Sequence, residues 1–200
     1  MVSHLKAWKD EYTRATWRGP YNIDHMKKYL AGGAKILDIG CGNGKLLIPL
    51  VRAGFNVIGI DLSRAGLLTI QHPGCLIQGD AINLPFKDEA FDAVVCYDLI
   101  QHLLEEERDR AIREIRRVLV PEGTLFLEVF GNKDMRYGGT LVEPDTFRRQ
   151  TGIIYHYFSE EEIKSALKDF TILSLESITT VKMFHGENFT RHRITAIAQK

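Results

Sequence analysis

The chain has 200 residues, of which 44% are hydrophobic and 26% are charged, a composition that suits one compact domain with a substantial core. Lysine plus arginine and aspartate plus glutamate number 26 each, so the net charge predicts no global attraction to nucleic acid or to an anionic membrane, although a local patch stays open. We find no apolar run near the ~20 residues of a membrane span and no secretion signal in residues 1–10, so we expect a cytoplasmic protein without membrane contact.

The cysteines and histidines do not indicate a metal centre or a disulfide framework. The three cysteines, Cys41, Cys75 and Cys96, are odd in number and form no C-x-x-C pair. The seven histidines show no H-x-x-x-H spacing. We therefore expect no bound metal.

The first 33 residues predict a helical cover. Residues 3–17 read as an exposed helix with aromatic side chains, and a second short helix is expected over residues 22–30. Two interpretations stay open for this segment. It covers one face of a sheet, or Trp17 and Tyr21, which flank a Gly-Pro hinge, close over a site and contact the substrate.

A glycine-rich stretch follows and organises the chain. The apolar run Lys35–Ile39 predicts a buried strand, and a helical pattern extends from Leu46 to about residue 53. The glycines between them do not fit the dinucleotide pattern G-x-G-x-x-G, because Lys45 stands at the third glycine position. They do not fit a phosphate-binding P-loop either, because Leu46 replaces the required hydroxyl residue. The pattern that fits is acidic-x-G-x-G-x-G, from Asp38 to Gly44.

Two acidic residues follow the next two predicted strands. Asp61 ends a strand over residues 55–60, and its two oxygens can accept both hydroxyls of a ribose, in NAD and in other nucleosides alike. Asp80 follows a strand over residues 75–78, and its carboxylate suits an exocyclic amine, which only donates. The alternatives are a helix cap for Asp61 and a turn residue for Asp80.

The second half of the chain predicts a strand over residues 91–96, a helix from residue 105 to about 117, and a strand over residues 124–130. In open α/β sheets ligands bind beyond the C-terminal strand ends, which places Tyr97 and His102 at a site. His102 is either a general base or a structural histidine, and we favour the structural role. Residues 131–158 look irregular. Ser159 begins a helix to about residue 168, and strands near 170–180 and 189–198 complete the chain.

Three motifs together resemble the class I S-adenosylmethionine (SAM) methyltransferases: Asp38 to Gly44, the run Gly-Asp-Ala-x-x-Leu-Pro-Phe from Gly79 to Phe86, and the strand opening Phe91-Asp92. The resemblance implies a three-layer αβα, Rossmann-like seven-stranded sheet in the order 3-2-1-4-5-7-6, with strand 7 antiparallel, in a single domain over residues 1–200. It implies SAM as the cofactor.

The resemblance also assigns site residues. The expected cofactor-binding residues are Asp38, Gly40, Cys41, Gly42, Gly44, Asp61, Leu62, Asp80, Ala81, Cys96 and Tyr97. The candidate catalytic residues are Tyr97 and His102. The candidate substrate contacts are Trp17, Tyr21, Tyr137 and Tyr155. The first two belong to an N-terminal segment of the kind that closes over the site in many small-molecule methyltransferases, and the last two lie in the segment 131–158, where relatives commonly build the acceptor pocket.

The first functional hypothesis is methyl transfer to a small-molecule acceptor, which depends mainly on positioning donor and acceptor in line. The second is an RNA or protein methyltransferase that uses the arginines at 148, 149, 191 and 193. The third is a non-catalytic SAM-binding partner subunit. The sequence leaves the acceptor open, and it leaves open whether the protein is a monomer or a homodimer.

Overall fold

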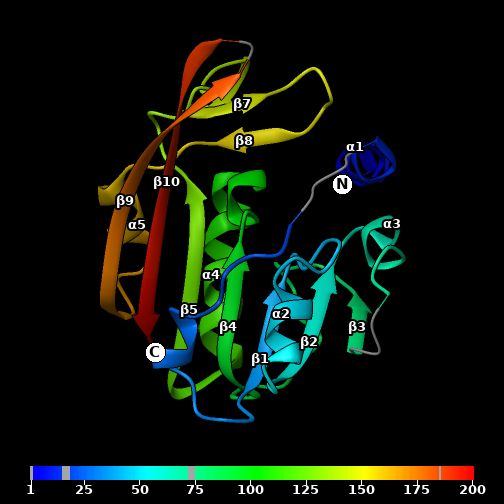
Figure 1. Cartoon of the computed structure of the whole chain (residues 1–200), viewed down its shortest axis with the longest axis vertical. Helices are drawn as coiled ribbons and strands as arrows, with labels where there is room; N and C mark the ends of the chain where they lie inside the picture. The colour runs from blue at the N-terminus through cyan, green and yellow to red at the C-terminus, as the bar shows by residue number, and fades with distance from the viewer. Residues whose placement is uncertain (1, 15–18, 72–74, 185) are drawn as a thin grey trace.

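A seven-stranded mixed sheet forms the centre of the protein in the computed structural model, which describes residues 2–14, 19–71, 75–184 and 186–200 (Figure 1). Its strands are β1 (Lys35–Ile39), β2 (Asn56–Asp61), β3 (Cys75–Gln78), β4 (Phe91–Tyr97), β5 (Leu119–Phe130), β9 (Thr171–Phe184) and β10 (Glu187–Gln199). The order β3-β2-β1-β4-β5-β10-β9, with β10 antiparallel to β5, confirms the predicted topology, in which β9 and β10 are the sixth and seventh strands.

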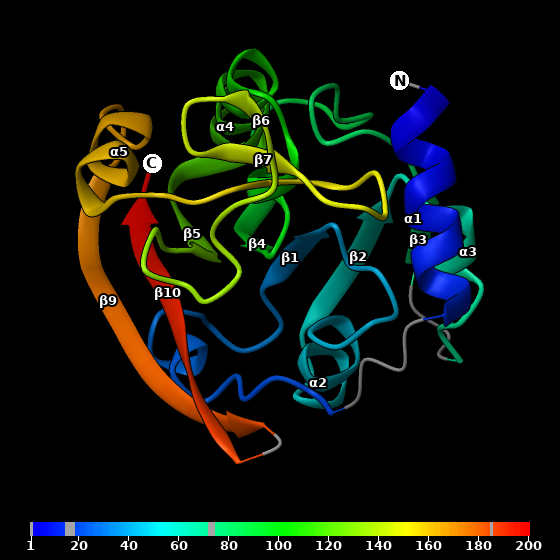
Figure 2. The same cartoon turned by 90° about the horizontal axis from the view of Figure 1, so that it is seen from above.

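Helices cover both faces of this sheet, as the view from above shows (Figure 2). One face carries α2 (Leu47–Arg52) and the short 3-10 helix η1 (Met26–Lys28), and the other carries α4 (Glu105–Val118) and α5 (Glu160–Ala166). The remaining helices are α1 (Val2–Arg14), α3 (Arg64–Leu67) and the 3-10 helix η2 (Ile100–His102). The predicted three-layer arrangement is therefore present.

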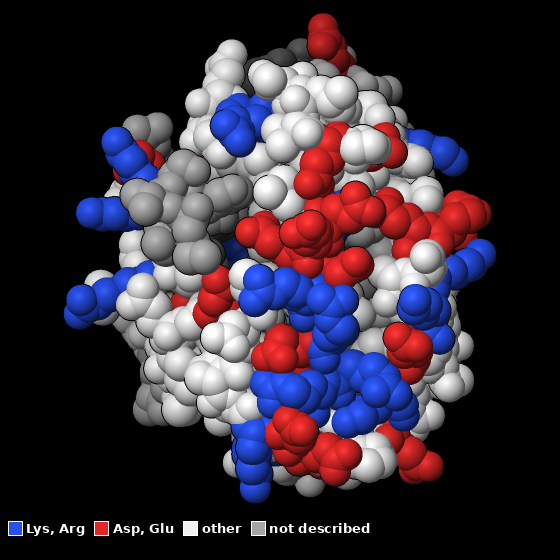
Figure 3. Space-filling model, turned by 180° about the vertical axis from the view of Figure 1, so that it is seen from behind, with Lys and Arg blue, Asp and Glu red and all other residues white. Residues whose placement is uncertain are grey.

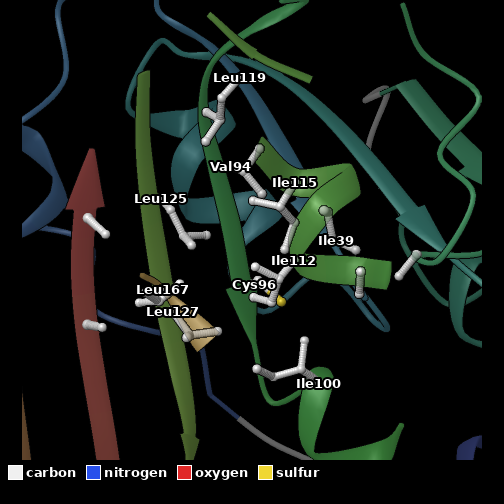
Figure 4. Close-up of a cluster of buried hydrophobic side chains, with 14 of the residues drawn as sticks. Ile39, Val94, Cys96, Ile100, Ile112, Ile115, Leu119, Leu125, Leu127 and Leu167 are labelled. Carbon is white, nitrogen blue, oxygen red and sulfur yellow. The ribbon is translucent and has the colours of Figure 1, made fainter. Parts of the chain in front are cut away.

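The core lies in two layers, one on each side of the sheet. Strand β4 shows why: Val94 and Cys96 belong to the layer under α4 and α5 (Figure 4), whereas Ala93 and Val95 belong to the layer under α2. Successive side chains of a strand point to opposite faces, and a parallel strand covered on both faces reads as a continuous apolar run. Helix α4 adds its own buried stripe, which includes Ile115.

Several predicted helices are shorter than expected. The helix predicted over residues 22–30 is only the single turn η1, and the helix predicted from Ser159 to about residue 168 is α5, which ends at Ala166. The helix after the glycines begins at Leu47 rather than at Leu46. Such short helices gain little from backbone hydrogen bonds alone, so tertiary packing sets their ends.

The segment 131–158 is more regular than its sequence indicates. It contains a separate antiparallel sheet of β6 (Thr140–Glu143), β7 (Thr146–Arg148) and β8 (Ile154–His156). Figures 1 and 2 place this sheet beyond the end of β5. Strands this short carry little periodic signal, which explains why the sequence did not predict them.

The parallel strands β1, β2, β4 and β5 end at the same edge of the sheet (Figure 1). The chain order reverses between β1 and β4, which makes that edge the topological switch point where α/β sheets bind ligands. Helix α1 and the small sheet both lie beyond this edge. None of the helices in the described ranges is long and apolar enough to cross a membrane.

Candidate functional site

The loop after β1 can only be built from glycine at two of its positions. Gly40 and Gly42 have φ angles of 74° and 52°, which L-residues rarely adopt. A Cβ at Gly40 would lie 3.0 Å from the Leu99 side chain, and one at Gly42 would lie 2.5 Å from the Tyr12 hydroxyl. Both the backbone conformation and the close neighbours therefore require the absence of a side chain, as a loop that cradles a ligand does.

Two cavities open beside this loop. The larger has a volume of about 340 Å³ and the smaller about 110 Å³. The residues that line both are Trp8, Tyr12, Gly40, Asp98 and His102. The two cavities therefore adjoin at the switch point, so one ligand can lie across them or two ligands can meet there.

Asp61 lies in the wall of the smaller cavity and already accepts several hydrogen bonds. The backbone N–H of Gly42 donates to one of its oxygens at 2.9 Å, and that of Ser63 donates to the other at 2.7 Å. The Tyr12 hydroxyl also donates to this carboxylate. Burial raises the pKa of Asp61 against these hydrogen bonds. A carboxylate has about four acceptor positions, so Asp61 serves the loop structure and still has room for a ribose hydroxyl.

Asp38 is the second acid of the site, and its Oδ2 atom is buried with no hydrogen-bond partner among the described residues. Burial, with Asp61 nearby, raises the pKa of Asp38 to about 7. A buried polar atom normally has a partner, so this oxygen is placed to receive a donor from a ligand in the larger cavity, which Asp38 lines.

Aromatic rings form one wall of the larger cavity. Phe130 and Tyr155 stack with ring centroids 6.1 Å apart and planes at 12°. His102 lies between Trp8 and Tyr155, with centroid distances of 4.8 and 4.7 Å and nearly perpendicular planes. This wall suits a flat ligand.

An ion-pair network lies beside this wall, because Arg193 packs over the Phe130 ring. Asp98, with a φ of 54° at the end of β4, accepts a hydrogen bond from the Tyr21 hydroxyl at 2.7 Å and one from Arg193 Nη1 at 2.9 Å. Burial opposes ionisation of Asp98, but Arg193 and the hydrogen bonds outweigh it and lower its pKa. Arg193 also pairs with Glu128, whose pKa burial raises to about 7 against the attraction of Arg193.

The two candidate catalytic residues, His102 and Tyr97, have different hydrogen-bond environments. His102 Nδ1 lies 2.9 Å from the carbonyl of Ile154, which can only accept, so Nδ1 carries the proton and Nε2 is the nitrogen that can take another. This bond ties η2 to β8. The Tyr97 hydroxyl lies 2.9 Å from His25 Nε2, and burial raises the pKa of Tyr97 well above its usual range. Tyr97 therefore stays protonated at neutral pH.

Most of the predicted site residues lie together. Those that line the larger cavity are Tyr21, Asp38, Gly40, Cys41, Gly42, Tyr97, His102 and Tyr155. Those that line the smaller cavity are Gly40, Asp61, Leu62, Asp80, Ala81 and His102.

Three predicted residues among those the structure describes are not brought to the cavities. Gly44 packs near Ile48, Cys96 is buried in the core, and Tyr137 is 45% exposed and bonds to Asp145. Trp17 lies outside the described residues.

Several cavity residues were not among the predicted cofactor, catalytic or substrate residues: Trp8, Tyr12, Lys45, Phe130, Arg136, Arg191 and Arg193, the last two of which were considered only for binding RNA or protein. One signal was available, because Arg191 and Arg193 are two apart in a strand and therefore share a face. Among the described residues, no group of three histidine, cysteine, aspartate or glutamate side chains could hold a metal ion.

Residues 37–127 match the family model described as a methyltransferase domain. The human protein "Probable tRNA methyltransferase 9B" is 40% identical over 100 residues, which are 49% of this chain and 22% of that protein. The mitochondrial ubiquinone biosynthesis O-methyltransferase of Bos taurus is 36% identical over 139 residues, 60% of this chain and 37% of that protein. The chain thus spans about a fifth of the first relative and somewhat over a third of the second.

A solved structure extends the similarity along the chain. The crystal structure of a SAM-dependent methyltransferase from Methanosarcina mazei has a TM-score of 0.74 and 27% identity to this chain. It covers 92% of this chain, which covers 99% of it in turn. The similarity therefore extends well beyond residues 37–127.

Proposed function

Because residues 37–127 form a class I SAM-dependent methyltransferase domain with SAM as its cofactor, we propose that the protein transfers the methyl group of SAM to a small-molecule acceptor. The observation that carries this proposal is the junction of two cavities at the switch point, one beside Asp61 and Asp80 and the other beside Asp38 and the aromatic wall. A cofactor that lies across both cavities leaves the part of the larger cavity beside the aromatic wall for the acceptor, where the two can be aligned for transfer.

The residues present fit the cofactor. The unpartnered Oδ2 of Asp38 suits the α-amino group of the methionine moiety, and the glycine cradle leaves room for its main chain. Asp61 suits the ribose, and Asp80 with the adjacent Ala81 suits the adenine in the smaller cavity. When bound, SAM supplies a methyl carbon whose bond to sulfur breaks, with the electron pair left on sulfur, as a lone pair of the acceptor forms the new bond.

The chain's own contribution is then mainly positioning and exclusion of water. Helix α1 and the aromatic wall close over the cavities, and Asp98 is fixed at their junction by Tyr21 and Arg193. His102 contributes a packed ring between Trp8 and Tyr155, which supports the structural role. Its Nε2 is also the nitrogen that can receive a proton from an N–H or O–H acceptor.

A small acceptor is favoured over RNA because most of the candidate RNA-binding arginines are held in bonds within the protein. Arg191 and Arg193 point into the larger cavity, where both form ion pairs with carboxylates. Arg149 donates to the carbonyl oxygens of Arg136 and Gly138. Of the four arginines considered for RNA, only Arg148 is exposed. Side chains in internal bonds are poor contacts for a phosphate backbone.

The mixed charges on the face behind the sheet also favour a small acceptor over RNA. Figure 3 shows acidic atoms gathered beside basic ones over this face. Helix α4 explains part of this pattern, because Glu105 to Glu107 occupy its first turn and Arg116 and Arg117 its last turn, as the helix dipole favours. Arg117 is further committed to Glu114 and Asp88. An RNA-binding face is more uniformly basic.

RNA nevertheless remains the second candidate, since a tRNA methyltransferase is among the relatives. The test is a transfer assay with methyl-labelled SAM against fractionated metabolites and against RNA. Label in a small-molecule fraction supports the proposal, whereas label only in RNA, with binding that weakens steeply with salt, supports the second candidate. SAM binding without transfer to any fraction would favour a non-catalytic partner subunit.

A further inference from the structure

The loop after β5 holds a carboxylate that serves two arginines. Asp134 is 2% exposed and accepts from Arg136 Nε at 3.0 Å and from Arg191 Nε at 2.8 Å. The backbone N–H groups of Arg136 and His192 donate to the same carboxylate at 3.0 and 3.2 Å. One negative charge therefore faces two guanidinium groups, and this cluster carries a formal surplus of one positive charge.

Arg136 brings this surplus positive charge to the larger cavity, which its side chain lines. Its guanidinium lies 4.0 Å from the centroid of Phe130, which fixes the plane of the group against the aromatic wall. The Nη2 atom is buried and has no hydrogen-bond partner among the described residues, although Arg136 lines the cavity. A buried guanidinium N–H without an acceptor is costly, so a ligand with an acceptor oxygen would relieve it.

The neighbouring cation does not compete for such a ligand. Arg193 also lies over Phe130, at 5.1 Å, but it pairs with both Asp98 and Glu128. Arg136 is therefore the arginine of this wall with a buried donor left over, as judged from the described residues.

The position of Arg136 separates it from the methionine end of the cofactor site. Arg136 packs on Phe130 at the end of β5, whereas the glycine cradle follows β1, and β4 lies between those two strands. Neighbouring strands are about 4.8 Å apart, so the two places are on the order of 10 Å apart across the sheet. Arg136 thus belongs to the part of the cavity that the acceptor would fill.

We infer that the acceptor carries an anionic oxygen group, a carboxylate or a phosphate, that Arg136 binds beside a flat body held by Phe130 and Tyr155. This inference rests on the proposed methyl transfer and narrows its substrate class. A guanidinium matches the geometry of a carboxylate or a phosphate and keeps its charge at any physiological pH. A neutral analogue of the same shape would leave the surplus charge and the Nη2 donor unmatched.

The test uses three fluorinated probes with one ring and different charge: 4-fluorobenzoate, 4-fluorophenyl phosphate and neutral 4-fluorobenzamide. Each is titrated into the full chain saturated with S-adenosylhomocysteine, and binding is followed by ¹⁹F NMR. We expect at least one anionic probe to bind at least about tenfold more tightly than the amide, since a charge-assisted hydrogen bond is worth ~1.5–3 kcal/mol. The stronger of the two anions identifies whether the group is a carboxylate or a phosphate.

Variants then assign the effect to Arg136. Arg136→Gln should lose about tenfold in affinity for the anionic probe while its affinity for S-adenosylhomocysteine stays unchanged. Arg136→Lys keeps the positive charge but lacks the planar guanidinium, so it should lose less affinity for the anionic probe than Arg136→Gln does. This partial rescue would show that the effect comes from the charge and not from misfolding. Arg113→Gln on α4 is the matched control, because Arg113 is exposed and lies outside both cavities. Thermal melting checks that every variant is folded.

Each other outcome overturns the inference in a recognisable way. Equal binding of benzoate, phosphate and amide, no binding of either anion, or unchanged binding in Arg136→Gln contradicts the anion site. Weaker S-adenosylhomocysteine binding in Arg136→Gln would assign this arginine to the cofactor carboxylate. Tight binding of tRNA that competes with the anionic probe would assign it to a nucleic acid. If the wild-type chain does not bind S-adenosylhomocysteine at all, the proposed function fails first, and the anion inference fails with it.

Discussion

The Tyr12 hydroxyl donates a hydrogen bond to the Asp61 carboxylate, which ties helix α1 to the end of strand β2 across the smaller cavity. The same tyrosine ring lies directly over Gly42 and Gly66. Burial and the nearby carboxylates raise the pKa of Tyr12, so the phenol stays protonated and donates at any ordinary pH. The carboxylate assigned to the ribose therefore has an internal partner before any ligand binds.

The first prediction follows from this bond. Asp61 has about one acceptor position left, so a ribose that bonds it through both hydroxyls must compete with the Tyr12 hydroxyl for the second. Tyr12→Phe removes that competitor and keeps the ring, so we expect S-adenosylhomocysteine to bind about fivefold more tightly, equivalent to one net hydrogen bond of ~1 kcal/mol. Isothermal titration calorimetry measures the change. Weaker binding in Tyr12→Phe would mean that the hydroxyl contacts the ligand instead.

The second prediction concerns Asp38 and pH. Its pKa of about 7 in the folded protein lies above the ordinary value of 3.8, so the native state holds a proton that the unfolded chain releases. The ligand-free protein should therefore lose stability as pH rises from about 4 to 7. Asp38→Asn removes the buried charge and should raise the melting temperature at pH 8 more than at pH 5. An equal shift at both pH values would contradict the assignment.

The same residue predicts the pH dependence of cofactor binding. An ammonium group binds the ionised carboxylate, so affinity should rise by about tenfold from pH 6 to pH 8 if the pKa of Asp38 is about 7. In Asp38→Asn the affinity should be lower and nearly independent of pH over this range. Calorimetry at the two pH values checks both statements, and a wild-type affinity that does not change with pH would refute them.

Two glycine variants test the cradle after β1. Gly42→Ala places a Cβ 2.5 Å from the Tyr12 hydroxyl at a φ of 52°, and the conformation alone costs about 1–2 kcal/mol. We expect a lower melting temperature and a large loss of S-adenosylhomocysteine binding. Gly32→Ala is the control, because nothing lies within 4 Å of its Cβ and its φ is not positive. Similar losses in both variants would show that the effect is not specific to the cradle.

Arg193 leads to a prediction about stability. Arg193→Gln leaves Asp98 and Glu128 without their cation, which should cost about 2 kcal/mol of unfolding free energy at pH 8. The loss should be smaller at pH 5, because Glu128, with a pKa near 7, is then protonated and needs no counter-charge. Urea unfolding at the two pH values measures the difference. A larger loss at pH 5 would contradict this account of the network.

The sequence predicted the part of the site that comes from local pattern. Gly40, Gly42 and the acids Asp61 and Asp80 lie at or just after the ends of strands, so their positions follow from the topology of the sheet. Tyr97 and His102 were placed at the cavities for the same reason. Local spacing and one sheet order were sufficient for these residues.

The rest of the site depends on contacts between distant parts of the chain. Tyr12 reaches Asp61 from a helix whose docking no local pattern encodes. Arg193 meets Asp98 across 95 positions in sequence, because β10 returns antiparallel beside β5. Arg136 is placed by a shared carboxylate and by the ring of Phe130. Tyr137, in contrast, was predicted at the site but packs on Phe147, away from the cavities.

The most direct test of the central claim is a calorimetric titration of the wild-type chain with SAM, S-adenosylhomocysteine and NADH in parallel. We expect one site per chain for the two sulfur nucleosides, with clearly weaker binding in Asp61→Ala and Asp80→Ala, and no binding of NADH. Binding of NADH without binding of SAM or S-adenosylhomocysteine would contradict the assignment of the cradle and every proposal built on it.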